Sequence, residues 1–255
     1  MQNKQLSTYD FTEDPSLQTP FWKDFWKNKI NGSTPCDPDV ESKQLQYCHK
    51  LAWGNRKLPC GKIFNLKEGD NCELIWEDEN MRFSSDWLIN TYIHWKRCYP
   101  VLKEIYDKNP SCYRNYMENF IRTTYTIGGS IIFPKRLNGI NQTRGCIDLI
   151  SDRFDLTLEC IRRYYDGNQE SPLKEVLNQD KKFFNLFVDF KGYVDFFYLK
   201  DLVSEDYKSV KIFFGHSDFK NVAYPRSSQE WNLWAQKAQE FIQKRNARID
   251  NESRK

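Results

Sequence analysis

The chain has 255 residues, and its 38 Lys and Arg against 35 Asp and Glu leave a net charge of only +3. This balance excludes a basic surface spread over the whole protein, so any nucleic-acid signature has to be local. Aromatic residues make up 16% of the chain. At this length they predict a folded domain whose core needs neither disulfides nor a metal, and no cofactor is expected.

The eight cysteines and three histidines do not have the spacing of metal ligands. The sequence contains no C-x-x-C pair, and the histidines lie far apart. We therefore expect free thiols and no metal site. The N-terminus leads into no apolar run, and no stretch approaches the ~18 apolar residues of a membrane span. The expected location is cytoplasmic, without contact to a membrane.

In chain order, residues 1–20 have little to bury and are expected to form a poorly ordered arm. Residues 21–250 are expected to form one domain, and residues 251–255 a frayed tail. Within the domain, apolar periodicity predicts a helix over residues 43–53 and a small meander ending near residue 76. Ser84 or Ser85 is expected to cap another helix that extends to about residue 99.

A β-hairpin is predicted over residues 121–133. Its first half, residues 121–127, is rich in β-branched and aromatic side chains, and Gly128-Gly129 would form the turn. Both faces carry apolar side chains, so other elements should cover both. Arg122 on this ribbon is expected to pair with one of three buried acids, Asp155, Glu159 or Asp189.

A polar loop and a strongly patterned helix follow the hairpin. Asn141, Gln142 and Arg144 in the loop carry the amide and guanidinium groups that recognise a base edge or a carboxylate. In residues 150–165, apolar side chains at steps of four, four, three and four predict a helix capped by Ser151. A second row on this helix is charged and contains Asp152, Asp155, Glu159 and Arg162. The alternative for this row is a set of i,i+3 and i,i+4 pairs that only stabilise the helix.

Farther along the chain, the pattern favours a helix over residues 183–190 and a strand over residues 210–214. For residues 193–199 it is compatible with either a helix or a buried strand. A capping box at residues 227–230 starts a long C-terminal helix that docks by Trp231, Trp234 and Phe241. The predicted fold class is therefore α+β: a single domain with a small antiparallel sheet or hairpins, packed by several helices and closed by this long helix.

Several stretches resemble an uncharacterised bacterial protein family, filed as a domain of unknown function. They are INQTRG, DRFDLTLECIRRYY, LFVDFKGYVDFFYLKDLV and FIQKRNARI, together with the earlier DPDVES, LAWGNRKLPCGKIFNL and RTTYTIGGSIIFP. The resemblance covers most of the chain. It implies a bacterial, cytoplasmic, single-unit protein, and it implies no activity or site residue.

We carry three functional hypotheses. The first is a protein that binds a nucleotide or nucleic acid, or an enzyme that acts on one. Its catalytic candidates are Glu159, Asp155 and Arg122, and its ligand-binding candidates are Asn141, Gln142, Arg144, Arg162 and Tyr125.

The second hypothesis is a non-catalytic interaction module, such as an immunity or accessory protein, whose charged rows are structural salt bridges and whose partner is a protein. A pocket that holds Arg122 and Glu159 would favour the first hypothesis, and a filled interior the second. The third is an assembly protein that uses Trp22, Trp26 and Trp231 as an exposed contact patch.

Overall fold

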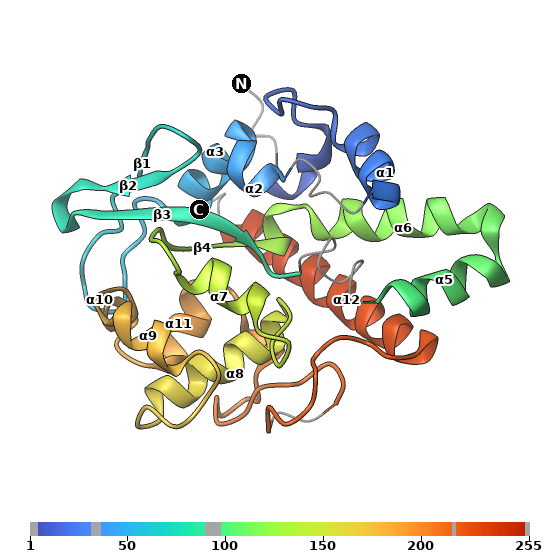
Figure 1. Ribbon diagram of the computed structural model, residues 1–255. Helices are drawn as coiled ribbons and strands as arrows, with labels where there is room; N and C mark the ends of the chain where they lie inside the picture. Colours follow the sequence, from blue (N-terminus) through green and yellow to red (C-terminus); the bar gives the residue numbers. More distant parts are fainter. Residues whose placement is uncertain (1–4, 32–36, 90–97, 216–217, 253–255) are drawn as a thin grey trace.

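The computed structural model describes residues 5–31, 37–89, 98–215 and 218–252. These residues form a single α+β domain with one four-stranded sheet and many helices (Figure 1). The predicted fold class is confirmed, including the long C-terminal helix α12 (Ser228–Glu252). No helix in the described ranges is both long and apolar enough to cross a membrane.

The sheet is antiparallel throughout, with strand order β1-β2-β3-β4. Its strands are β1 (Lys67–Glu68), β2 (Leu74–Trp76), β3 (Met81–Trp87) and β4 (Ser130–Pro134). The first three follow one another as a meander, whereas β4 arrives from much later in the chain. It pairs with β3 so that Trp87 faces Ser130 and Phe83 faces Pro134.

Helices cover the sheet from both sides (Figure 1). One group comes from the N-terminal part of the chain: α1 (Phe21–Asn31), α2 (Pro38–Glu41) and α3 (Lys43–Trp53). The other group comprises α7 (Ile140–Cys146), α8 (Phe154–Tyr165), α9 (Lys174–Gln179), α10 (Lys181–Phe184) and α11 (Phe190–Phe196). Single 3-10 turns lie at Leu6–Thr8, Phe11–Glu13, Glu77–Glu79, Ile127–Gly129, Asn185–Phe187 and Lys200–Leu202.

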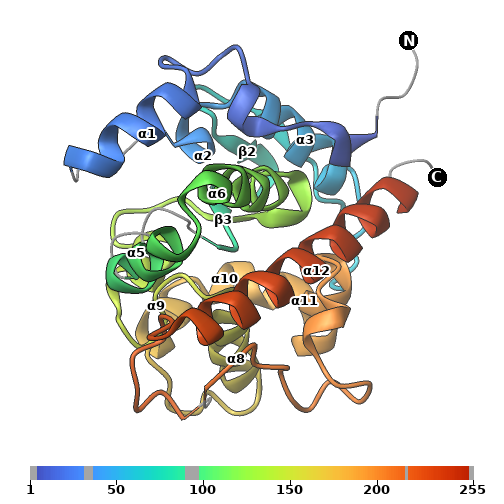
Figure 2. The same ribbon diagram turned by 90° about the vertical axis from the view of Figure 1, so that its right-hand side faces the viewer.

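The helix α12 runs diagonally between these groups, as Figure 2 shows, and contacts α5 (Tyr99–Lys108) and α6 (Pro110–Thr124). Its predicted start is confirmed, because the Ser227 hydroxyl accepts a hydrogen bond from the Glu230 amide at 3.2 Å. Trp231, Trp234 and Phe241 are all buried, as expected.

The predicted hairpin over residues 121–133 is wrong in its first half. Residues 121–124 are the last turn of α6, which begins with Pro110 and continues a buried stripe through Tyr113, Met117, Phe120 and Thr124. Helical periodicity therefore outweighs the β-branched composition of the segment. Gly129 is required because a Cβ there would lie 1.7 Å from the Thr124 carbonyl oxygen, not because it turns a hairpin.

Two further sequence expectations are corrected. Ser84 and Ser85 lie in β3 and pair with β4, so neither caps a helix. Most of the helix expected after them falls on residues 90–97, outside the described residues. Residues 210–214 form no named strand and contribute only an isolated bridge between Val203 and Val210.

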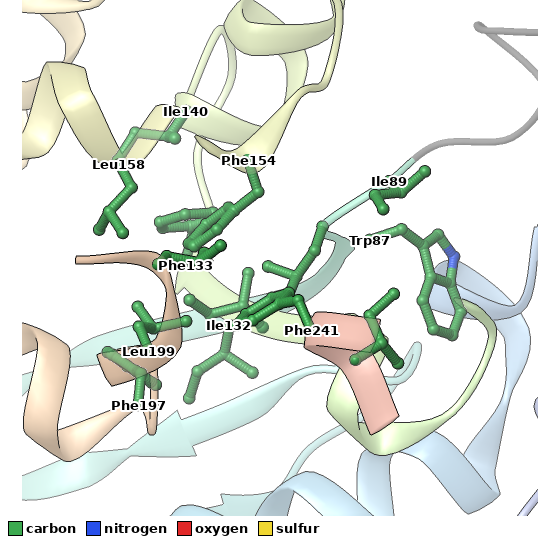
Figure 3. Packing of buried hydrophobic residues seen from close by; sticks show 14 of the residues in the cluster. Trp87, Ile89, Ile132, Phe133, Ile140, Phe154, Leu158, Phe197, Leu199 and Phe241 are labelled. Atoms are coloured by element: carbon green, nitrogen blue, oxygen red, sulfur yellow. The ribbon is translucent and has the colours of Figure 1, made fainter. Parts of the chain in front are cut away.

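The central helix α8 is confirmed as part of the core. Phe154, Leu158 and Ile161 are buried, and Figure 3 shows Phe154 and Leu158 near Ile140 and Phe133. The helix starts at Phe154 and not after Ser151, whose φ of 45° lies in the left-handed region.

The aromatic side chains of the N-terminal part pack inward. Phe11 is fully buried, with its ring centroid 6.2 Å from that of Trp87. Trp231 is also fully buried, while Trp22 and Trp26 are half-buried. The exposed contact patch of the assembly hypothesis therefore does not include Trp231.

Candidate functional site

Arg122 lies on α6, away from the acids that were expected to pair with it. Its guanidinium pairs with Asp10 and with Glu13, the latter at 2.7 Å, and lies 4.8 Å from the centre of the Trp22 ring. About two fifths of the side chain (38%) is exposed. The predicted pair with Asp155, Glu159 or Asp189 is wrong, because the helix directs Arg122 toward the N-terminal segment.

The acids of α8 each have their own arginine partners. Asp155 is fully buried, pairs with Arg153, and accepts a hydrogen bond from the Phe213 amide at 2.8 Å. Glu159 pairs with Arg162 at 2.8 Å and with Arg163 at 2.9 Å. The Glu159 pairs match the structural alternative for the charged row, in which acids and bases at i,i+3 and i,i+4 satisfy one another, whereas the partner of Asp155 lies two positions earlier in the chain.

The amide-rich segment is the helix α7 and not a loop. Asn141 Nδ2 donates to Ser84 Oγ and to the Ser85 carbonyl, both at 3.1 Å, and so attaches α7 to β3. Gln142 accepts from the Asn138 amide at 3.0 Å, within its own turn. Arg144 is fully buried. The three side chains predicted to bind a ligand therefore point to different neighbours.

Tyr125 is buried at the end of α6. Its ring stacks on Trp87 with centroids 4.3 Å apart and contacts Phe21 at 5.3 Å. Because protein side chains lie against the ring, Tyr125 is part of the aromatic core in this conformation.

A polar groove of about 770 Å³ lies beside α7 and α9. Asn138 and Thr143 line it together with Lys174 and Asn178, whereas Arg122 and Glu159 do not. The pocket that would have favoured the first hypothesis is therefore not found at this groove, although its volume falls within the range of ligand sites.

A different set of acids comes together beside β3, and we call it the carboxyl centre. It comprises Asp37 and Asp39 at the start of α2, Asp86 near the end of β3, and Asp152 just before α8. The Trp87 indole donates to Asp37 Oδ1 at 2.9 Å and so connects α2 to β3. Asp86 and Asp152 are buried, while Asp37 and Asp39 are half-buried and form the accessible side.

Arg144 holds the inner side of the carboxyl centre. Its Nη1 donates to Asp86 Oδ2 at 2.8 Å and to the Trp87 carbonyl at 2.7 Å. Its Nη2 donates to the Asp152 carbonyl at 3.0 Å, and Nε donates to Thr157 Oγ1 at 3.1 Å. A second ion pair joins Nη1 to Asp152 Oδ1 at 3.5 Å. This fork fixes β3, α7 and α8 around one buried positive charge.

Burial and mutual repulsion raise the pKa values of three of these carboxyl groups, Asp37, Asp39 and Asp86. Burial raises the pKa of Asp86 to about 7, although the Arg144 charge opposes the shift. For Asp39, burial and then the charges of Asp37 and Asp86 raise the pKa well above its ordinary value of 3.8. Burial also raises the pKa of Asp37, against the hydrogen bond from Trp87. Because the pKa values of Asp37, Asp39 and Asp86 are raised, these groups keep their protons to a higher pH than ordinary carboxyl groups do.

Of this centre, the sequence analysis selected only Arg144 and Asp152, and it assigned them to other groupings. Asp37 and Asp39 appeared only in DPDVES, one of the stretches that carry the family resemblance, and Asp86 fell in a segment that was expected to be helical. Two acids separated by one residue in DPDVES were the available signal, since like charges so close in a short turn repel each other. Nothing local in the sequence indicated that Asp86 would lie beside them.

The described ranges contain no group of three or more His, Cys, Asp or Glu side chains arranged to hold a metal ion. Because the pKa values of Asp37, Asp39 and Asp86 are raised, we interpret the carboxyl centre as a site that holds protons. Fold and site together define an α+β protein with a buried, carboxylate-rich centre.

The chain belongs to a family of unknown function, DUF6994, whose model matches residues 7–249. This match confirms the resemblance to a domain of unknown function that was read from the sequence. No curated protein and no solved structure matches the chain.

Proposed function

We propose that the protein is a hydrolytic enzyme in which the carboxyl centre supplies a general acid and a general base. One observation carries this proposal: four carboxyl groups from three separate parts of the chain lie close enough for their charges to act on one another, and two of them pair with the buried guanidinium of Arg144. Strongly perturbed carboxyl groups of this kind gather at catalytic sites more often than at structural ones.

Asp37 and Asp39 are assigned to act on a substrate, because these two residues are half-buried whereas Asp86 and Asp152 are buried. A hydrogen bond between their carboxyl groups raises the pKa of Asp39, in addition to the effects of burial and of the Asp37 charge. In such a pair one proton is shared, so one group can donate while the other accepts. Asp37, which also binds the Trp87 indole, is assigned as the base, and Asp39 as the acid.

The reaction is a hydrolysis. Asp37 removes a proton from water, the water oxygen bonds to the substrate carbon, the bond to the leaving group breaks, and Asp39 protonates the leaving group. Asp86 and Arg144 are positioning residues, because their ion pair joins β3 to α7 next to Trp87, whose indole binds Asp37.

The negative charge of the centre selects the substrate class. An excess of carboxylates repels phosphate groups and accepts hydrogen bonds from hydroxyl groups. Glycosidic bonds are typically cleaved by two carboxyl groups of which one is protonated. Within the predicted class of nucleotide ligands, this favours the N-glycosidic bond of a nucleoside over a phosphodiester of RNA or DNA.

The test is a hydrolysis screen with purified protein against nucleosides, nucleotides, short RNA and short DNA, read by chromatography of released base. Asp37→Asn and Asp39→Asn are expected to lower turnover of a cleaved nucleoside by at least about 100-fold, the usual contribution of a general acid or base. Asp195→Asn is the matched control, since Asp195 pairs with Lys191 on an exposed helix face. Equal turnover in all three variants would overturn the proposal.

The same screen tests the roles first predicted for Glu159, Asp155 and Arg122 in catalysis, and for Asn141, Gln142, Arg144, Arg162 and Tyr125 in binding. Glu159→Gln is the most direct variant, because Glu159 has only helix neighbours as ion-pair partners. A loss of turnover in Glu159→Gln with none in Asp39→Asn would move the active site to α8.

A second candidate function is the non-catalytic interaction module, and one observation favours it. Arg122, Asp155 and Glu159 all form ion pairs within the chain. Under this alternative, substitutions at Asp37 and Asp39 change only stability, and no compound in the screen is cleaved or raises the melting temperature.

A further inference from the structure

Another buried arginine, Arg245, lies on α12. Its hydrogen bonds within the described residues all go to main-chain carbonyls. Its Nε donates to Phe197 at 2.9 Å, and its Nη1 donates to Gly128 at 2.8 Å and Ser130 at 2.7 Å. The Trp53 ring lies below the guanidinium, with its centroid 5.4 Å away.

The remaining nitrogen of this guanidinium, Nη2, is buried and has no hydrogen-bond partner. Within residues 5–31, 37–89, 98–215 and 218–252, no carboxylate pairs with Arg245. Burial lowers the pKa of Arg245 to about 9, which reflects the cost of a positive charge without a counter-ion. Carbonyl dipoles offset part of this cost, but they bring no negative charge.

Tyr193 on α11 is the second unsatisfied group of this region. It is fully buried, and its hydroxyl has no hydrogen-bond partner. The two residues share Phe197 as a neighbour, because the Tyr193 ring packs on the Phe197 ring at 5.1 Å while Arg245 binds the Phe197 carbonyl. The charges of Arg245 and Arg144 both act on this phenol.

His49 cannot neutralise the region either. Its Nδ1 accepts from the Trp53 indole at 2.8 Å, and its Nε2 contacts Ser130 Oγ at 3.0 Å. Burial and the Arg245 charge lower the pKa of His49 to about 3, so it stays neutral. The surroundings of Arg245 therefore carry one uncompensated positive charge and two unused donors.

We propose that a small inorganic anion of chloride size binds inside the protein, between Arg245 Nη2 and the Tyr193 hydroxyl. The anion accepts hydrogen bonds from both groups and supplies the missing negative charge. A buried water would also satisfy the two donors, but it would leave the guanidinium unpaired. The proposal rests on Arg245 and Tyr193, which have no role in the proposed hydrolysis, so it does not depend on that activity.

The experiment follows thermal unfolding of the full-length protein at pH 7 in sodium chloride and in sodium gluconate of equal ionic strength, since gluconate is too large for a buried site. Chloride is expected to raise the melting temperature in a saturable way that gluconate does not reproduce. Tyr193→Phe removes only the hydroxyl and is expected to raise the half-saturating chloride concentration about fivefold, as for the loss of one hydrogen bond.

Tyr165→Phe is the control, because the Tyr165 hydroxyl already donates to the Phe184 carbonyl at 2.6 Å and lies outside this site. It is expected to keep the wild-type chloride response. Arg245→Met is expected to abolish the response, and Tyr193→Phe keeps the test decisive if Arg245→Met does not fold. Equal melting curves of the wild type in chloride and gluconate would assign the site to water and overturn the proposal.

Discussion

The charged face of α8 and the carboxyl centre are built from the same residue types, yet their charges are balanced differently. On α8, Glu159 has two arginines, Arg162 and Arg163, and all three are neighbours in sequence. In the carboxyl centre, one buried guanidinium pairs with Asp86 and Asp152, and four carboxyl groups from distant parts of the chain act on one another's charge. Acidic and basic side chains are present in both regions. What distinguishes a site that holds protons from a stabilised helix is how many acids share each base and how deeply the acids are buried.

The largest effect is expected from removing Arg144, the arginine that pairs with Asp86 and Asp152 in the carboxyl centre. Arg144→Met should lower the free energy of unfolding by about 3 to 5 kcal/mol, because it leaves buried carboxylates without their counter-ion. Arg122→Met is the matched control, and because its side chain is 38% exposed it should cost less than about 1 kcal/mol. Denaturant unfolding measures both. Similar losses in the two variants would contradict the contrast between a buried and a surface arginine.

The next effect concerns what holds α8 in place. Leu158→Ala should cost about 2 to 5 kcal/mol, because Leu158 is fully buried in the core. Urea unfolding measures this loss, provided that the dependence of the unfolding free energy on urea concentration is the same in the variant and the wild type. A loss below about 1 kcal/mol would mean that the core does not depend on the apolar side of α8.

A smaller effect is expected from pH. The unfolded chain releases the Asp86 proton near pH 4, whereas the folded protein keeps it until about pH 7. Between these values the folded state binds more protons, so its stability should fall as pH rises, by at most about 1.4 kcal/mol per pH unit for one group.

Asp86→Asn should flatten that slope, and the difference between wild type and variant isolates Asp86 from Asp37 and Asp39, whose pKa values are also raised. Unfolding by denaturant at several values from pH 4 to pH 8 provides the curves. Parallel curves for the two proteins would show that Asp86 is ionised throughout.

The smallest effect is expected on the charged face itself. Arg162→Met should lower stability by about 0.5 kcal/mol, since Glu159 keeps Arg163 as a second partner. Thermal unfolding of the wild type and the variant at low and high salt measures this loss. The difference in melting temperature should be smaller at high salt, because ions screen the Glu159–Arg162 pair. A loss of several kcal/mol would mean that α8 depends on its charges as strongly as the carboxyl centre does.

Sequence by itself determined the elements whose pattern is local. The helices α3, α8 and α12 were predicted from apolar spacing, and the Ser227 cap from its motif, because helix hydrogen bonds and caps join residues only a few positions apart. The burial of Leu158 and Trp231 followed from the same stripes.

Only the tertiary structure decided the partner of β4 and the composition of the carboxyl centre. A strand pairs with whatever lies beside it, and β4 pairs with β3 and not with residues 121–127, the first four of which end α6. That pairing places Asp86 near α2, while Arg144 and Asp152 reach it from α7 and the segment before α8. Charges so far apart in sequence become neighbours only when the chain folds, so their shifted pKa values have no local signature.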